Sequence, residues 1–144
     1  MTTTQTKNIN WYYIGLVVFY IVFGTYGHGV LGQEDLFNAE VMKTSEMYVF
    51  ISNFSSWHMH TLQNACFGLY FIYAARTSKP HLTIHAVWLA AAISITRPLA
   101  ITIGILIYAP SDLIYVSFPL LLNVIALILM WFGVRKVKRD LVAS

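Results

Sequence analysis

The sequence predicts an all-α integral membrane protein: a bundle of four transmembrane helices with both termini in the cytoplasm and a long outer loop between the first two helices. Three observations predict this fold. The chain of 144 residues is 58% hydrophobic and only 10% charged, with a mean hydropathy of +0.64, which is typical of membrane proteins. It contains four apolar stretches, each near the roughly 20 residues that span a bilayer. Its basic clusters all fall on one side of a four-pass topology.

The first apolar stretch covers about residues 11–31. It is too long and too aromatic for a cleaved signal peptide, so we expect a retained first helix. The loop behind it, at about 33–53, mixes acidic residues with large apolar ones. That mixture predicts a segment that is partly helical and lies in the outer membrane interface.

The other three apolar stretches cover about residues 54–75, 82–108 and 113–134. Pro80 fits the start of the third helix, and the link APSD, with Pro110 and Asp112, predicts a tight turn. Such short connections make the third and fourth helices antiparallel neighbours. We therefore expect one four-helix domain over residues 1–144, which ends in a basic cytoplasmic tail at 135–144.

The net charge of +3 is distributed unevenly. The basic residues on the predicted inner side are Lys7, Arg76, Lys79, Arg135, Lys136, Lys138 and Arg139. By the positive-inside rule both termini face the cytoplasm, and we expect the protein in the cytoplasmic membrane. The basic tail indicates contact with anionic membrane lipids and not with nucleic acid. Other partners left open are a second copy of the chain and a larger membrane complex.

Helical spacing predicts which polar side chains face the interior of the bundle, where polar groups avoid lipid. The predicted inward-facing residues are Trp57, His60, Thr61 and Asn64 in the second helix, Ser94 and Arg97 in the third, and Asn123 in the fourth. A count from the predicted helix ends, at about 1.5 Å per residue, places Asn64, Arg97 and Asn123 near the bilayer midplane.

Arg97 is the most unusual of these residues, because a guanidinium at the bilayer centre costs at least about 2.5 kcal/mol on insertion scales and stays charged. No acidic residue lies in the apolar stretches near it. One interpretation is a structural pin, in which the two asparagines, water and a carbonyl freed by Pro98 near Ser94 satisfy the guanidinium. The other is a binding pocket for an anionic or carbonyl-bearing amphiphile, such as a fatty acid, a quinone or a lipid headgroup. That pocket would be lined by Arg97, Asn64, Asn123, His60, Thr61, Ser94 and Trp57.

His28 and His60 are expected at similar depth on two different helices. They are candidate axial ligands of a b-type haem, or ligands of copper or zinc. They are also candidate acid–base groups, since imidazole titrates near neutrality. His58 lies two residues from His60 and points elsewhere on a helix, so these two cannot bind one metal together.

Three segments resemble the DoxX-like group of small four-helix membrane proteins: YFIYAARTSKP, ITRPLAITIG and LLLNVIA. The similarity covers about two thirds of the chain. In that group the polar position of the fourth helix is often acidic and could balance the arginine, whereas here it is Asn123. The resemblance implies a four-helix fold, a membrane location and a link to redox or small-molecule metabolism.

Three functions follow as hypotheses, and no motif identifies a reaction. The leading one is a membrane protein that binds an amphiphilic or anionic ligand around Arg97. The first alternative is a membrane enzyme or electron carrier that uses His28 and His60. The second alternative is a structural subunit of a larger membrane complex.

Overall fold

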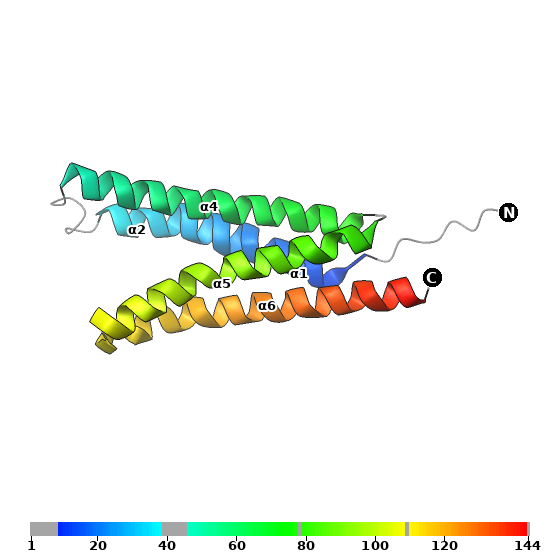
Figure 1. Cartoon of the computed structure of the whole chain (residues 1–144). Helices are drawn as coiled ribbons and strands as arrows, with labels where there is room; N and C mark the ends of the chain where they lie inside the picture. Colours follow the sequence, from blue (N-terminus) through cyan, green and yellow to red (C-terminus); the bar gives the residue numbers. More distant parts are fainter. Residues whose placement is uncertain (1–8, 39–45, 78, 109, 144) are drawn as a thin grey trace. The chain divides into compact units, whose positions relative to one another are not determined.

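The structure is a computed structural model that describes residues 9–38, 46–77, 79–108 and 110–143. Every regular element in these ranges is a helix (Figure 1). The prediction of an all-α protein is therefore confirmed for the described part of the chain. The predicted outer loop at 33–53 lies partly outside these ranges, because residues 39–45 are not described.

The first helical rod consists of three elements in direct succession: α1 (Trp11–Val18), a π-helix η1 (Phe19–Leu31) and α2 (Gly32–Asn38). The wider π-type hydrogen bonding is seen where the Gly32 N–H donates to the carbonyl of Gly27, five residues earlier. Thr25 repeats this spacing with its side chain, which donates to the carbonyl of Tyr20 over 2.9 Å. The rod extends seven residues beyond the predicted end at residue 31.

The remaining elements are α4 (Met47–Arg76), a 3-10 turn η2 (Pro80–Leu82), α5 (Thr83–Tyr108), a 3-10 turn η3 (Pro110–Asp112) and α6 (Leu113–Val142). Helix α4 begins at Met47 and not at residue 54, so part of the predicted outer loop is helical. Helix α6 continues to Val142, so the predicted tail at 135–144 is helical over most of its length. The residues there are good helix formers, and Lys136 and Asp140 form an i,i+4 ion pair of 2.6 Å.

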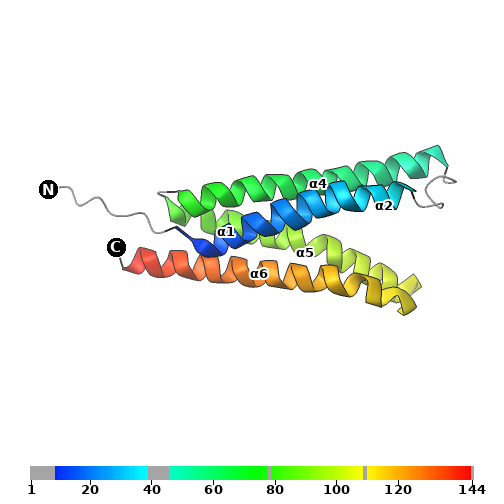
Figure 2. The same ribbon diagram turned by 180° about the vertical axis from the view of Figure 1, so that it is seen from behind.

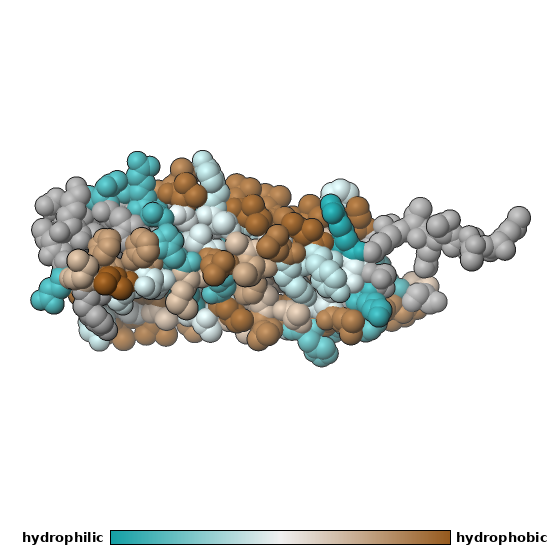
Figure 3. All heavy atoms as spheres, turned by 90° about the horizontal axis from the view of Figure 1, so that it is seen from above, coloured by the Kyte–Doolittle hydropathy of each residue, from teal (hydrophilic) through white to brown (hydrophobic). Residues whose placement is uncertain are grey.

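Three helices in the described ranges are long and apolar enough to cross a membrane: Trp11–Glu34, Thr83–Tyr108 and Ser117–Val142. Large apolar side chains are exposed along all three, and the face in Figure 3 shows hydrophobic residues over much of the middle of the view. Helix α4 differs because serine, asparagine, histidine, threonine and glutamine recur between Ser52 and Asn64. The structure thus supports a membrane protein, with α4 as its most polar long helix.

The helices form two compact units, which we describe separately. The hairpin unit, Ile14–Tyr73, packs α4 alongside η1 and α2 (Figure 1, Figure 2). Its contact pairs are Ile21 with Gly68, Gly24 with Asn64, His28 with His60, and Gly32 with Trp57. In each pair the residue numbers add up to 88 or 89, which describes two antiparallel helices in one continuous register. Tyr20 closes the apolar end of this unit and stacks on Phe71 at 5.7 Å.

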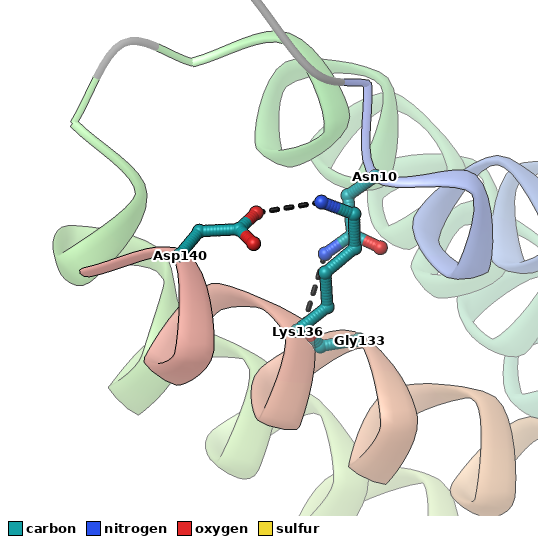
Figure 4. Close-up of polar contacts among 4 residues, drawn as sticks. All are labelled: Asn10, Gly133, Lys136 and Asp140. Atoms are coloured by element: carbon teal, nitrogen blue, oxygen red, sulfur yellow. Dashed lines mark hydrogen bonds and ion pairs between the residues drawn. The ribbon is translucent and has the colours of Figure 1, made fainter. Parts of the chain in front are cut away.

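The α5–α6 unit comprises Met1–Tyr13 and Ala74–Ser144. Asn10 anchors the start of α1 in this unit: its side-chain amide donates to the carbonyl of Gly133 over 3.0 Å (Figure 4). Tyr13 is fully buried and lies directly against Gly133, where any Cβ would clash with its ring. The buried core continues along α5 and α6 through Val87, Ala90, Ala91, Ala126, Met130, Val134 and Val137.

Candidate functional site

The predicted site residues fall into two groups, one in each compact unit. Trp57, His60, Thr61 and Asn64 lie in the hairpin unit together with His28. Ser94, Arg97 and Asn123 lie in the α5–α6 unit. The first group is brought into contact across η1 and α4.

His28 lies at the centre of the group in the hairpin unit. Its ring stacks on the indole of Trp57, with centroids 3.7 Å apart and planes inclined by 22°. It meets the ring of His60 edge to face, with centroids 4.8 Å apart. The glycines around His28 in GTYGHGVLG keep the face of η1 narrow, which lets these large rings fit between the two helices.

This geometry limits the cofactors that His28 and His60 could hold. A haem between two axial imidazoles places the iron about 2 Å from each nitrogen, so the ring centres would lie about 6 Å apart on opposite faces of the macrocycle. The edge-to-face contact at 4.8 Å does not fit that arrangement. Among the described residues there is no group of three or more His, Cys, Asp or Glu that could hold a metal ion. Two imidazoles alone supply only half of a tetrahedral zinc site.

Asn64 is one turn further along α4 and is 6% exposed. Its side-chain amide donates to the carbonyl of Gly24 over 3.1 Å. A Cβ at Gly24 would lie 2.8 Å from the Asn64 Cγ, so only glycine allows this approach. Thr61 bonds within α4, to the carbonyl of Trp57 at 3.1 Å. The Asn64 amide N–H is therefore used in packing the hairpin, and the Thr61 hydroxyl is used within α4 itself.

Arg97 lies in α5 immediately before Pro98, which is inside the helix. Ser94 and Arg97 continue the line of buried residues that ends at Ala91, and both are partly buried. The Nη1 atom of Arg97 is buried and has no hydrogen-bond partner among the residues that the structure describes. The buried guanidinium nitrogen thus differs from the Asn64 amide, which has its acceptor.

Asn123 lies on the face of α6 that carries Ala126 and Met130. Its side-chain amide donates to the carbonyl of Pro119, one turn earlier in the same helix, over 2.8 Å. The predicted inward position of Asn123 is therefore combined with a hydrogen bond inside its own helix. The argument from helical spacing did not consider such a bond. The signal was present in the sequence, because asparagine side chains bond to carbonyls four residues back.

The sequence interpretation overlooked Asn10. This residue is 6% exposed, and its backbone N–H also reaches the carbonyl of Ala75 at 3.5 Å. An asparagine directly before an apolar helical run is a helix-start signal, and the position could have been recognised from that pattern. No sequence pattern indicated that Gly133 would be the hydrogen-bond partner of Asn10.

No protein-family model, curated protein or solved structure matches the chain. The resemblance to the DoxX-like group therefore stays a prediction.

Proposed function

We propose that the protein is a small integral membrane protein that binds an anionic or carbonyl-bearing amphiphile, such as a fatty acid, a quinone or a lipid, with Arg97 as the anchoring residue. The observation that carries this proposal is the buried Nη1 atom of Arg97 without a hydrogen-bond partner in the described ranges. The residue lies within Thr83–Tyr108, a helix able to cross a membrane.

Physical chemistry favours a ligand at this position. A guanidinium has five donors in a planar fork and remains charged at all physiological pH values. Buried polar groups are almost always hydrogen-bonded, and a buried charge without a partner costs several kcal/mol. A carboxylate, phosphate or quinone carbonyl that enters from the lipid would supply the acceptor and, in the first two cases, the opposite charge.

The polar residue of the fourth helix adds to this argument. Asn123 donates its amide N–H to the carbonyl of Pro119 in its own helix, and as an uncharged residue it supplies no carboxylate that could pair with Arg97. Two features define the class of ligand. The guanidinium donor requires a headgroup with a hydrogen-bond acceptor, and the lipid-facing surface of α5 favours an apolar tail.

The proposal includes four membrane passes in the cytoplasmic membrane, with both termini in the cytoplasm. Its support is the antiparallel register of the hairpin unit, which runs α4 alongside the span Trp11–Glu34 and so back through the membrane. The basic clusters then all fall on one side. Green fluorescent protein fused to the C-terminus should fluoresce, and alkaline phosphatase fused there should be inactive; the reverse result would contradict this topology.

The binding proposal is tested with delipidated, detergent-purified protein and three probes: oleate, a short-chain ubiquinone and a phosphatidylglycerol. At least one of them should raise the melting temperature of the wild type, while octadecane, which has neither a charge nor a hydrogen-bond acceptor, serves as the control. Arg97→Gln should abolish the shift. Arg76→Gln removes an exposed arginine and should leave it unchanged. The absence of any shift in the wild type, or an equal shift in Arg97→Gln, would overturn the proposal.

A second candidate function rests on the contact between His28 and His60 at 4.8 Å. Two imidazoles on adjacent helices can hold and pass a proton near neutral pH. In this role the protein would be a membrane enzyme that uses the pair as acid and base. Activity towards a candidate substrate that survives His60→Gln with an unchanged pH profile would exclude the pair.

A further inference from the structure

The last two turns of α6 are the most charged part of the described chain. From Leu113 to Val134 the helix has no charged residue. Those 22 residues span about 33 Å at 1.5 Å per residue, close to the thickness of the hydrocarbon core. Arg135 therefore lies where α6 leaves the hydrocarbon, and the following turns lie at the level of the lipid headgroups.

The charges in these turns are sorted onto different faces of α6. Lys136 pairs with Asp140, and Figure 4 shows this pair beside Asn10 and Gly133. Arg135, Lys138 and Arg139 are all exposed. At 100° per residue they share an arc of about 100° with Trp131. We call these four residues the α6 stripe.

The buried residues of α6 in these turns, Met130, Val134 and Val137, lie outside the arc of the stripe. No acidic residue occurs in the stripe, because Asp140, the one acid between Leu113 and Val142, belongs to the pair with Lys136. The stripe thus presents three positive charges outward.

Aromatic rings support the stripe from the membrane side. The guanidinium of Arg135 lies over the ring of Trp131, 4.5 Å from its centroid. Trp131 contacts Phe132 at 5.0 Å, and Phe132 stacks on Tyr12 at 5.6 Å. Tryptophan and tyrosine favour the interface, and the indole holds the guanidinium in place through a cation–π contact.

We propose that the α6 stripe is a binding site for the headgroup of an anionic phospholipid: Arg135 and Arg139 bind the phosphate, Lys138 adds charge, and the Trp131 ring packs against the first acyl segments. Charge complementarity selects this occupant, since an exposed set of cations at the headgroup level faces anionic lipid in any bilayer that contains it. This site is separate from Arg97 and does not depend on the proposed function.

The stripe makes a sharper prediction than general attraction between basic residues and an anionic surface. Near such a surface, each basic residue raises the binding affinity about fivefold, whichever face of the helix it occupies. In a binding site, by contrast, the loss of affinity on substitution depends on which face of the helix carries the residue. Lys136 provides the matched control, because it lies in the same turns and its charge is paired with Asp140.

The test is native mass spectrometry of the full-length protein with equimolar phosphatidylglycerol and phosphatidylcholine of identical acyl chains. We expect the wild type to retain phosphatidylglycerol preferentially. The triple variant Arg135→Gln, Lys138→Gln, Arg139→Gln should lose the preference by about tenfold or more, whereas Lys136→Gln should retain it. Circular dichroism of each variant verifies that the helices are intact.

Three results would overturn the proposal. The first is a wild type that binds both lipids equally. The second is a triple variant that keeps its preference, or a Lys136→Gln variant that loses as much of it as the triple variant, since charge alone would then explain binding. The third is a wild type without lipid preference that binds a short oligonucleotide, which would assign the stripe to a soluble polyanion.

Discussion

Asn64 and Arg97 are two polar residues predicted at the same depth in the membrane, but they differ in their hydrogen bonding. In the hairpin unit the Asn64 amide has its acceptor, the carbonyl of Gly24 at 3.1 Å, and a glycine makes room for it. In the α5–α6 unit the Nη1 atom of Arg97 has no acceptor in the described ranges. One polar group is satisfied by its own chain, and for the other we propose a ligand as the partner.

This difference distinguishes a packing role from a binding role. A polar group that is bonded across a helix pair contributes to stability, and its removal is costly. A buried donor without a partner contributes nothing by hydrogen bonding to the unliganded protein, and its removal costs little. Substitution of the bonded polar group in the hairpin unit should therefore lower stability. Substitution of Arg97 in the α5–α6 unit should instead lower ligand binding.

The largest loss of stability is expected at Gly24. Gly24→Ala places a methyl group 2.8 Å from the Asn64 Cγ, which forces η1 and α4 apart and should cost about 1–3 kcal/mol. Thermal unfolding of the detergent-purified protein measures the loss. Gly104→Ala is the control, because a Cβ there meets nothing within 4 Å, and it should be neutral or slightly stabilising. Equal effects of the two changes would contradict the tight contact.

The next largest effect is expected for Asn64→Ala. This change removes the bond to Gly24 and leaves a part-buried carbonyl without this donor, at a cost of about 1–2 kcal/mol. Asn123→Ala should cost less, because the Asn123 amide bonds only to its own helix. The same unfolding assay compares the two variants, and a larger loss for Asn123→Ala would show that α6 depends on this amide.

A smaller effect is expected where rings stack in the hairpin unit. Trp57→Leu retains apolar bulk but removes the stacking on His28 at 3.7 Å, which should cost about 1 kcal/mol. Trp88→Leu changes an exposed tryptophan on α5 and should cost less. If Trp88→Leu proves the more damaging change, the stacked cluster is not important for stability.

The smallest effect on stability is expected at Arg97. In delipidated protein, Arg97→Gln should leave the free energy of unfolding unchanged or raise it, because no hydrogen bond is lost and a buried charge without a partner is removed. After addition of a ligand only the wild type should gain stability. A loss of several kcal/mol in the delipidated variant would identify Arg97 as a structural pin.

The amino-acid pattern predicted most of the architecture. Apolar length and short connections located four helices, since in a membrane protein the span length is set by the bilayer. Helix ends were less accurate: α4 begins at Met47 and α6 ends at Val142, where amphipathic or charged residues continue a helix beyond the hydrocarbon. The π-helical form of η1 was not predicted, because the glycine-rich segment that adopts it is also compatible with an α-helix.

The site could be predicted only in part. Helical phase grouped Trp57, His60 and Asn64 correctly on one face of α4, which packs against η1. It could not predict which acceptor each amide chooses, because that choice depends on distances of a few tenths of an ångström. Asn64 bonds to the neighbouring rod, whereas Asn123 bonds to its own helix.

The central claim is that a molecule from the membrane supplies the acceptor that Arg97 lacks. The most direct measurement is native mass spectrometry of the wild type and Arg97→Gln, purified in parallel in a mild detergent, with Arg76→Gln as the control. We predict that the wild type and Arg76→Gln carry one retained amphiphile with a carboxylate, phosphate or quinone headgroup, and that Arg97→Gln does not. Retention of the same molecule by Arg97→Gln, or a wild type that carries none, would contradict the account.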